Sequence, residues 1–232
     1  MKVNYSYVYL AFFLLLNIFN FVDRNLLIAF APQIKSEFNL TNVQWGLLTG
    51  VYFLFFYSVF GIFMGVLGDK FSRMKIAAAG VFLWSLMTAF TGVAKNFSHL
   101  IVARALIGVG ESALTPNAIS MLSDLFKQNQ RGTASAIYYL GIPLGVGFGM
   151  LIAAFFGPAY GWRSVFITLG LIGMGLGILT YFLLEPRRGQ LDISFDEDNK
   201  STSIRDIISM TKHALYNSKC LTFVIIGSIF LH

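Results

Sequence analysis

The chain has 232 residues, of which 56% are hydrophobic, 16% aromatic and only 12% charged, and its formal net charge is +6. Because soluble domains carry about a quarter charged residues, this composition excludes an ordinary water-soluble fold. The basic residues are dispersed between apolar runs and form no stripe with interleaved aromatic residues, so nucleic acid is excluded as a partner.

Long apolar runs follow one another along the chain. A helix needs roughly 20 mostly apolar residues to cross about 30 Å of hydrocarbon. Six segments meet this requirement, with approximate bounds 7–31, 44–68, 76–94, 100–122, 133–157 and 165–184. We therefore expect an all-α membrane protein whose first domain, residues 1–186, is a bundle of six transmembrane helices.

The basic residues predict the orientation of this bundle. If the N-terminus is cytoplasmic, most of the 17 lysines and arginines fall in inner loops, while the outer loops hold Lys35, Lys95 and Arg163. This imbalance satisfies the positive-inside rule. We expect a multi-pass integral protein with a cytoplasmic N-terminus, and the short loops favour a plasma membrane of the bacterial inner-membrane type.

The composition changes after Pro186. Residues 187–219 are polar, with isoleucines at helical spacing, which predicts a cytoplasmic linker containing an amphipathic helix. Residues 220–232 are apolar again but too few to cross a bilayer. We interpret them as the start of a truncated seventh transmembrane helix, and the missing partner as a C-terminal six-helix half.

Four ionisable residues lie inside the predicted spans. Each costs about 3 kcal/mol at the bilayer centre, so their presence needs a reason. Asp23 and Arg24 belong to the first span, and Arg104 and Glu111 to the fourth. A rise of about 1.5 Å per residue puts Asp23 and Arg104 at similar depth, so the two can pair. We expect Arg104, Gly108 and Glu111 to share a helix face that lines a cavity, with the glycine leaving room between the charges.

These charges suggest proton coupling. A carboxyl group in a low dielectric beside an exchangeable partner can bind and release a proton, which makes Glu111 the first candidate carrier and Asp23 a competing one. Arg104 can alternately hold a carboxylate or an anionic substrate head group. Three asparagines either add hydrogen bonds to this cavity or tie helices together: Asn17, Asn20 and Asn117. The simpler alternative is a structural ion pair, or arginines that extend to the interface.

The loop between the second and third spans reads G-V-L-G-D-K-F-S-R-M-K from Gly65 onward. It resembles the signature loop of the major facilitator superfamily, G-x-L-x-D-R-x-G-R-[RK], with Gly65, Asp69, Lys70 and Arg73 in register. The resemblance implies a cytoplasmic gate loop whose charges lock helices together. Ser72 replaces the usual glycine, which makes the turn less permissive of a positive φ.

Two further segments agree with this resemblance. Residues 104–111 are similar to the fourth-helix motif of the superfamily, whose arginine is associated with proton coupling, and residues 141–149 to its glycine-rich fifth helix. Gly141, Gly145 and Gly149, at a spacing of four, make a groove for close helix approach, and Pro143 weakens the backbone hydrogen bonding locally. Such a groove serves packing, sliding contacts or both.

Within the superfamily, residues 20–24, 104–111 and 143–147 look most like Spinster-type transporters, which are linked to export of lysolipids and sphingosine phosphate. The resemblance implies two inverted three-helix repeats and a secondary active transporter that works by alternating access, coupled to protons, on a small amphiphile or organic anion such as a lysolipid. It implies substrate, protons and the bilayer as partners, and no cofactor or metal.

Other functions stay open at this point. Organic-anion, sugar-acid and drug transporters of the same superfamily share similar N-terminal halves. A transporter-like half can also act as a scaffold or sensor without transporting. A membrane-embedded enzyme is disfavoured, because the sequence carries no H-E-x-x-H motif, no paired cysteine and histidine and no nucleophile elbow.

Overall fold

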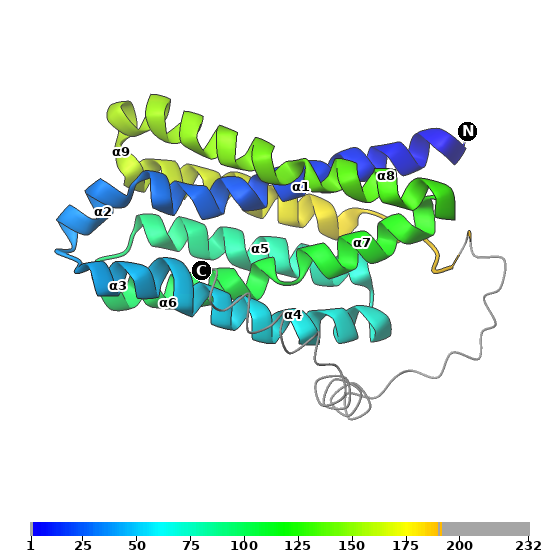
Figure 1. Ribbon diagram of the computed structural model, residues 1–232, viewed down its shortest axis with the longest axis horizontal. Coiled ribbons are helices and arrows are strands. Elements are labelled where there is room, and N and C mark those ends of the chain that lie inside the picture. The colour runs from blue at the N-terminus through cyan, green and yellow to red at the C-terminus, as the bar shows by residue number, and fades with distance from the viewer. Residues whose placement is uncertain (1, 190, 192–232) are drawn as a thin grey trace, which may run out of the picture. The chain divides into compact units, whose positions relative to one another are not determined.

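Helices make up nearly all of the computed structural model, which describes residues 2–189 and 191 (Figure 1). The elements are α1 (Lys2–Ala29), α2 (Ala31–Glu37), α3 (Asn42–Gly46), the π-helical turn η1 (Leu47–Val51), α4 (Tyr52–Lys70), α5 (Arg73–Gly92), α6 (Phe97–Glu111), α7 (Leu114–Leu125), α8 (Gln128–Tyr139) and α9 (Gly141–Phe182). The predicted start of a seventh span (220–232) and nearly all of the predicted linker (187–219) lie outside the described residues.

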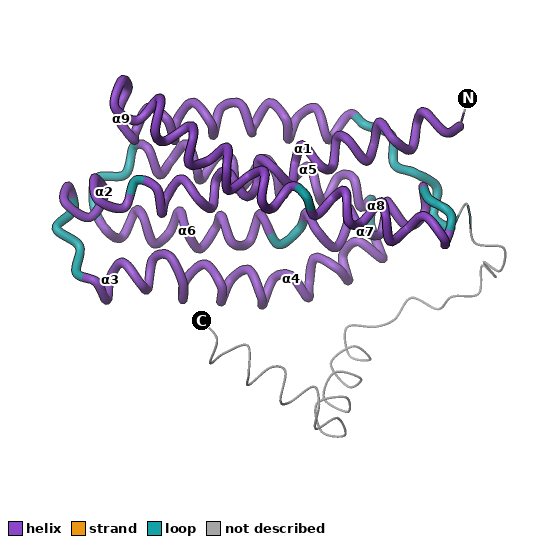
Figure 2. The backbone as a smooth tube through the Cα atoms, turned by 45° about the horizontal axis from the view of Figure 1, so that its top comes forward, coloured by secondary structure: helices purple, strands orange, loops and turns teal. Residues whose placement is uncertain are grey.

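Several of these helices are separated only by short breaks and together form single membrane crossings. Within the described residues, five helical stretches are long and apolar enough to cross a bilayer: Tyr5–Ala29, Asn42–Lys70, Arg73–Gly92, Phe97–Leu125 and Gln128–Phe182. The last is 55 residues long and leaves helical geometry at Gly161, with φ 76° and ψ 157°. The backbone turns back on itself there (Figures 1 and 2), so this stretch supplies two crossings, and the expected six-helix, all-α bundle is confirmed.

Prolines account for the interruptions within two crossings. A proline has no amide hydrogen for the carbonyl four residues earlier, so a helix weakens just before it. Pro116 follows the break between α6 and α7, and Pro143 follows the break between α8 and α9. Pro143 lies in the first turn of α9, and the amide hydrogen that it lacks would otherwise bond to the carbonyl of Tyr139, the last residue of α8.

Glycines let the helices approach closely. A Cβ atom on Gly145 would lie 2.5 Å from the Cβ of Phe21 and 2.6 Å from the carbonyl oxygen of Ile18, so α9 rests on the backbone of α1 at this point. Gly141 and Gly149 touch the same helix one turn to either side. The glycine groove read from the sequence is therefore the seam between α1 and α9.

Two apolar clusters form the core, and polar residues lie between them. One cluster includes Phe13, Leu16 and Trp84, and the other includes Leu26 and Phe30. Along α1 the buried polar residues Asn17, Asn20 and Asp23 occupy the stretch where the first cluster gives way to the second. Large apolar side chains cover much of the outer surface, as a lipid environment requires.

Candidate functional site

A buried ion pair joins the first and fourth crossings. Nε of Arg24 on α1 donates a hydrogen bond to Oε2 of Glu111 on α6 at 2.5 Å. The Glu111 side chain is completely buried, while that of Arg24 is 21% exposed. Pairing compensates the burial of both charges, and the exposed part of Arg24 leaves one approach to the pair.

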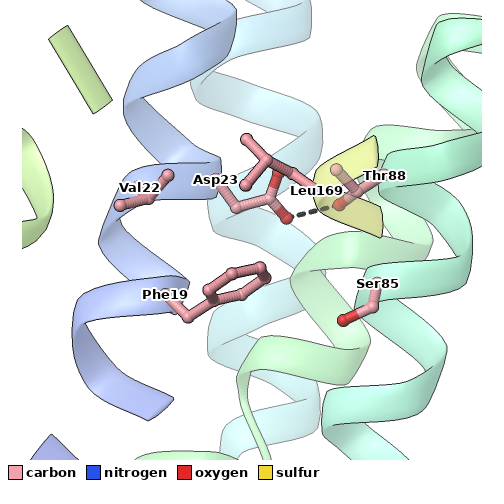
Figure 3. Close-up of a pocket in the computed structure, with 6 residues that line it drawn as sticks. All are labelled: Phe19, Val22, Asp23, Ser85, Thr88 and Leu169. Atoms are coloured by element: carbon pink, nitrogen blue, oxygen red, sulfur yellow. Dashed lines mark hydrogen bonds between the residues drawn. The ribbon is translucent and has the colours of Figure 1, made fainter. Parts of the chain in front are cut away.

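The expected pair between Asp23 and Arg104 is absent: no ion pair within 4.0 Å joins them in the described part of the chain. Asp23 instead accepts a hydrogen bond from Thr88 of α5 (Figure 3). The estimate of depth was sound, because Asp23 and Arg104 line one cavity of about 10 Å³, room for about one water molecule. Depth along a helix does not determine rotation about its axis, and α1 turns Asp23 towards α5.

The space expected between the charges on α6 is filled by α4. Gly108 admits the backbone of that helix, since a Cβ at this position would lie 2.8 Å from the carbonyl oxygen of Phe53. The Phe53 ring then lies 4.8 Å from the guanidinium carbon of Arg24 and 4.4 Å from that of Arg104. One aromatic ring thus contacts two cations, and the Tyr57 ring lies 4.7 Å from Arg24.

Three polar atoms of this cluster are buried without a hydrogen-bond partner: Nδ2 of Asn20, Nε of Arg104 and Oε1 of Glu111. Each such atom costs about 1–3 kcal/mol compared with a paired one. Native structures hold few of them, and they concentrate where water, an ion or a ligand binds. The cluster can therefore form further hydrogen bonds in the membrane interior.

Asn117 does not belong to this cluster. Its Nδ2 donates to the carbonyl of Ala113 at 2.7 Å, and its Oδ1 lies where a Cβ on Gly68 would be. It therefore contributes to the contact between α7 and α4. Asn17 likewise ties helices together, donating to the carbonyl of Tyr138 at 2.8 Å. Asn20 is the asparagine that stays in the cluster, buried and with its Nδ2 unpartnered.

Arg73 organises the basic end of the bundle, where α4, α7 and α9 finish. Its buried guanidinium donates to Oδ2 of Asp124 at 2.5 Å and to Oε1 of Glu185 at 3.0 Å. It also donates to the carbonyl of Pro186 at 3.1 Å. Burial alone would raise the pKa of Glu185, but hydrogen bonds from Ser72 and Arg73 bring this pKa below its usual value.

The remaining loop residues behave differently from Arg73. Asp69 and Lys70 are exposed, and a Cβ on Gly65 would have nothing within 4 Å. The carbonyls of Gly68 and Phe71 each accept a hydrogen bond from Nη2 of Arg188 at 2.7 Å, which caps the end of α4. The locking contacts are thus made by Arg73 and by three residues that the sequence analysis missed, Asp124, Glu185 and Arg188.

Ser72 fits the position where the family usually has glycine. It adopts φ −63° and ψ 114°, so the turn needs no positive φ, contrary to the concern raised by the sequence. Its Oγ accepts the amide hydrogen of Lys75 at 3.3 Å and thereby caps the N-terminus of α5. Serine in place of the usual glycine thus makes the backbone less flexible at residue 72 and supplies a cap for α5.

A second polar network closes the opposite end of the bundle. Oε1 of Glu37 accepts a hydrogen bond from Nη2 of Arg163 at 2.6 Å, and Oε2 accepts one from Nε1 of Trp162 at 2.8 Å. Arg163 also donates to the carbonyl of Gly92 at 2.9 Å. The hydrogen bond from Arg163 lowers the pKa of Glu37. The sequence analysis gave these residues no such role.

Comparison with known proteins places the chain in a family. The model of the Major Facilitator Superfamily matches residues 13–231. Protein spinster of Drosophila melanogaster is 30% identical over 214 residues, which are 90% of this chain and 35% of that protein. The sphingosine-1-phosphate transporter SPNS2 of Danio rerio is 32% identical over 76% of this chain and 36% of its own length. The probable L-galactonate transporter of Escherichia coli is 29% identical over 73% and 37%.

Solved structures agree. A bacterial homolog to the human lysosomal transporter Spinster, inward-facing and occupied, superimposes with a TM-score of 0.71 and 31% identity, over 81% of this chain and 46% of that one. Its inward-facing, unoccupied form gives a TM-score of 0.73 and 28% identity, over 88% and 48%. The chain thus spans about a third of these curated relatives and about half of the solved structures. It belongs to the major facilitator superfamily, a superfamily of transporters and not of enzymes, and is a multi-pass integral membrane protein.

Proposed function

We propose that the complete protein is a secondary active transporter that works by alternating access and couples proton movement to that of a small amphiphile or organic anion such as a lysolipid. The observation that carries this proposal is the Arg24–Glu111 ion pair in the middle of the bundle. Oε1 of Glu111 has no hydrogen-bond partner there. Ionisable residues inside a membrane are expensive and mark substrate or ion pathways.

The charges of the cluster favour an anionic substrate. Arg24 pairs with Glu111, whereas Arg104 has no carboxylate within 4.0 Å in the described residues and its Nε is unpartnered. Protonation of Glu111 would release Arg24, so that both guanidinium groups become available to a phosphate or carboxylate. Proton binding and anion binding are then linked through one ion pair. Asp23, without a cationic partner within 4.0 Å in the described residues, is the second candidate proton carrier.

The relatives suggest two kinds of anion. SPNS2 is named for sphingosine-1-phosphate, a lipid with a phosphate head, whereas the E. coli relative is named for L-galactonate, a sugar acid. The large apolar side chains that flank the cluster, among them Phe53, favour the amphiphile. The sugar acid is the second candidate, and a substrate panel distinguishes them.

The test is substrate-driven proton flux into proteoliposomes that contain the complete gene product. We expect Glu111→Gln and Asp23→Asn each to lower coupled flux at least about tenfold, because neither replacement can release a proton. Glu37→Gln, which neutralises a carboxylate in the network at the opposite end, should leave flux unchanged. The proposal fails if both intramembrane replacements transport like the unchanged protein. Lysolipids and sugar acids are compared in the same vesicles.

We also propose that the basic end of the bundle is cytoplasmic and that its network around Arg73 belongs to a cytoplasmic gate. The distribution of lysines and arginines supports this orientation. In a Cys220→Ser background, Lys70→Cys should react with a membrane-impermeant maleimide only in inside-out vesicles, and Lys35→Cys only in right-side-out vesicles. The opposite pattern would reverse the orientation.

A further inference from the structure

Thr88 lies between two hydrogen-bond acceptors. Its hydroxyl oxygen is 2.9 Å from the carbonyl oxygen of Trp84 and also contacts Oδ2 of Asp23 (Figure 3). A threonine hydroxyl carries one hydrogen and can donate only one hydrogen bond at a time, although it can also accept. Thr88 makes a full hydrogen bond to each of them only when Asp23 is protonated: the carboxyl O–H then donates a hydrogen bond to the Thr88 oxygen, and the Thr88 hydroxyl donates one to the Trp84 carbonyl.

No other donor reaches this contact: the Ser85 hydroxyl also lines the pocket, but its Oγ makes no hydrogen bond in the described residues. Asp23 is 4% exposed and Thr88 2%, and the pocket that they line with Phe19, Ser85 and Leu169 has no room for a water molecule. The lining residue contributed by α9, Leu169, brings no hydrogen-bonding side chain to the pocket. The proton count must therefore close within the Asp23–Thr88 pair.

The other charged groups around Asp23 act at longer range. Arg24 is its neighbour on α1, and Arg104 and Glu111 face it from α6. The second cavity, which Asp23 shares with Arg104, has room for about one water molecule. Asp23 thus borders a dry pocket on one side and a potentially hydrated cavity on the other.

We infer that Thr88 is a two-position hydrogen-bond switch that allows Asp23 to hold and release a proton inside the membrane. When Asp23 is protonated, its O–H donates to Thr88 and the threonine hydroxyl donates to the Trp84 carbonyl. When the proton leaves through the cavity beside Arg104, the Thr88 hydroxyl turns and donates to the carboxylate. In both states Oδ2 of Asp23 keeps a hydrogen-bond partner, the loss of which would be costly in this environment.

This inference rests on the proposed proton coupling, and it makes Thr88 a positioning residue. Thr88→Val has nearly the same shape but removes both the donor and the acceptor. The hydrogen bond to the ionised carboxylate is the stronger of the two, so the valine variant penalises the ionised form more. We expect the pH at which Asp23 is half-protonated to rise by about one unit.

The chain offers a matched control. Thr180 on α9 is also fully buried and donates to the carbonyl four residues earlier, that of Leu176, at 2.7 Å. It contacts no carboxylate among its hydrogen bonds in the described residues. Thr180→Val therefore removes the same local hydrogen bond without the switch, and Thr88→Ser restores the hydroxyl.

The experiment titrates the complete protein in lipid by difference infrared spectroscopy, with Asp23→Asn used to assign the carboxyl band of Asp23. The same variants are then compared for the pH profile of proton flux. We expect Thr88→Val to move both midpoints upward, while Thr88→Ser and Thr180→Val titrate like the unchanged protein. An unshifted Asp23 band in Thr88→Val would overturn the switch. A shifted band in a protein whose flux ignores Asp23→Asn and Glu111→Gln would instead retain the switch and refute proton coupling.

Discussion

Two glycines of α9 allow a direct test of the packing between α1 and α9. Gly145 and Gly147 are two residues apart on the same helix, yet their surroundings differ. A Cβ on Gly145 would meet Phe21 at 2.5 Å, the Ile18 carbonyl at 2.6 Å and the Val22 amide at 3.1 Å, whereas a Cβ on Gly147 would have nothing within 4 Å. The two alanine substitutions therefore add the same methyl group to a filled seam and to an open surface.

The magnitude follows from this comparison. Replacing a helical glycine by alanine stabilises a helix by up to about 1 kcal/mol, and this gain is common to both variants. What remains is the overpacking cost at Gly145, at the upper end of roughly 1–3 kcal/mol because two of the opposing atoms belong to the backbone of α1. We expect Gly145→Ala to be less stable than Gly147→Ala by about 3 kcal/mol, a difference in Tm of roughly 6–12 °C for a chain of this size.

The assay is thermal unfolding of both purified variants in the same detergent, followed by loss of the monodisperse peak in size-exclusion chromatography. Gly147→Ala should melt at or slightly above the Tm of the unchanged protein, which shows that alanine itself is tolerated in this helix. Equal Tm values for the two variants would refute the close approach of α9 to α1 at Gly145.

Three further predictions concern the ends of the bundle. Asp124→Ala leaves Arg73 buried with Glu185 as its remaining carboxylate in the described residues, so we expect thermal denaturation to show a stability loss of about 3 kcal/mol. Asp69→Ala, at an exposed position, should cost less than about 0.5 kcal/mol, and equal losses would contradict the network. The hydrogen bond from Arg163 holds the pKa of Glu37 below its usual value, so the ion pair stabilises the fold at neutral pH and this contribution is lost as the pH falls through the folded-state pKa. The contribution is under about 1 kcal/mol because the pair is exposed, and Glu37→Gln should remove it from the acid-induced drop in Tm; an unchanged drop would count against the pair. Gly161→Ala should cost about 1–3 kcal/mol from backbone strain alone, because φ 76° and ψ 157° are nearly exclusive to glycine and no atom blocks the new methyl group; a normal Tm would argue for a different turn.

The sequence was informative about features that depend only on position along the chain or along a helix axis. Hydrophobic length gave the six crossings, and the spacing of Gly141, Gly145 and Gly149 gave a helix-packing face. Position along a helix also placed Asp23 and Arg104 at one level, which their shared cavity bears out. Rotation of one helix against another is a different quantity. It depends on which side chains fill the space between three or more helices, and no local window contains that information.

The network at the basic end also could not be predicted from the sequence, because its hydrogen-bond partners lie far apart in the chain. Arg73 bonds to Asp124, 51 residues away, and to Glu185, 112 residues away. A loop motif indicates that Arg73 has a partner without showing where the partner lies. One local signal was present: Asp124 is in the last turn of α7, where a negative charge is unfavourable for the helix dipole. An acidic residue at such a position needs a cation to stabilise it, and that requirement points towards a basic partner.

The distribution of satisfied and unsatisfied groups separates the ends of the bundle from its middle. At the basic end every carboxylate oxygen of Asp124 accepts a hydrogen bond, and at the opposite end both oxygens of Glu37 do. Glu111, in the middle, has one oxygen paired and the other buried without a partner. If these six helices move as one body during transport, the networks at the ends keep the crossings together while the middle retains unused hydrogen-bonding capacity. The proposed transport cycle would use that capacity, since a fully satisfied cluster would gain no hydrogen bonds by binding a ligand.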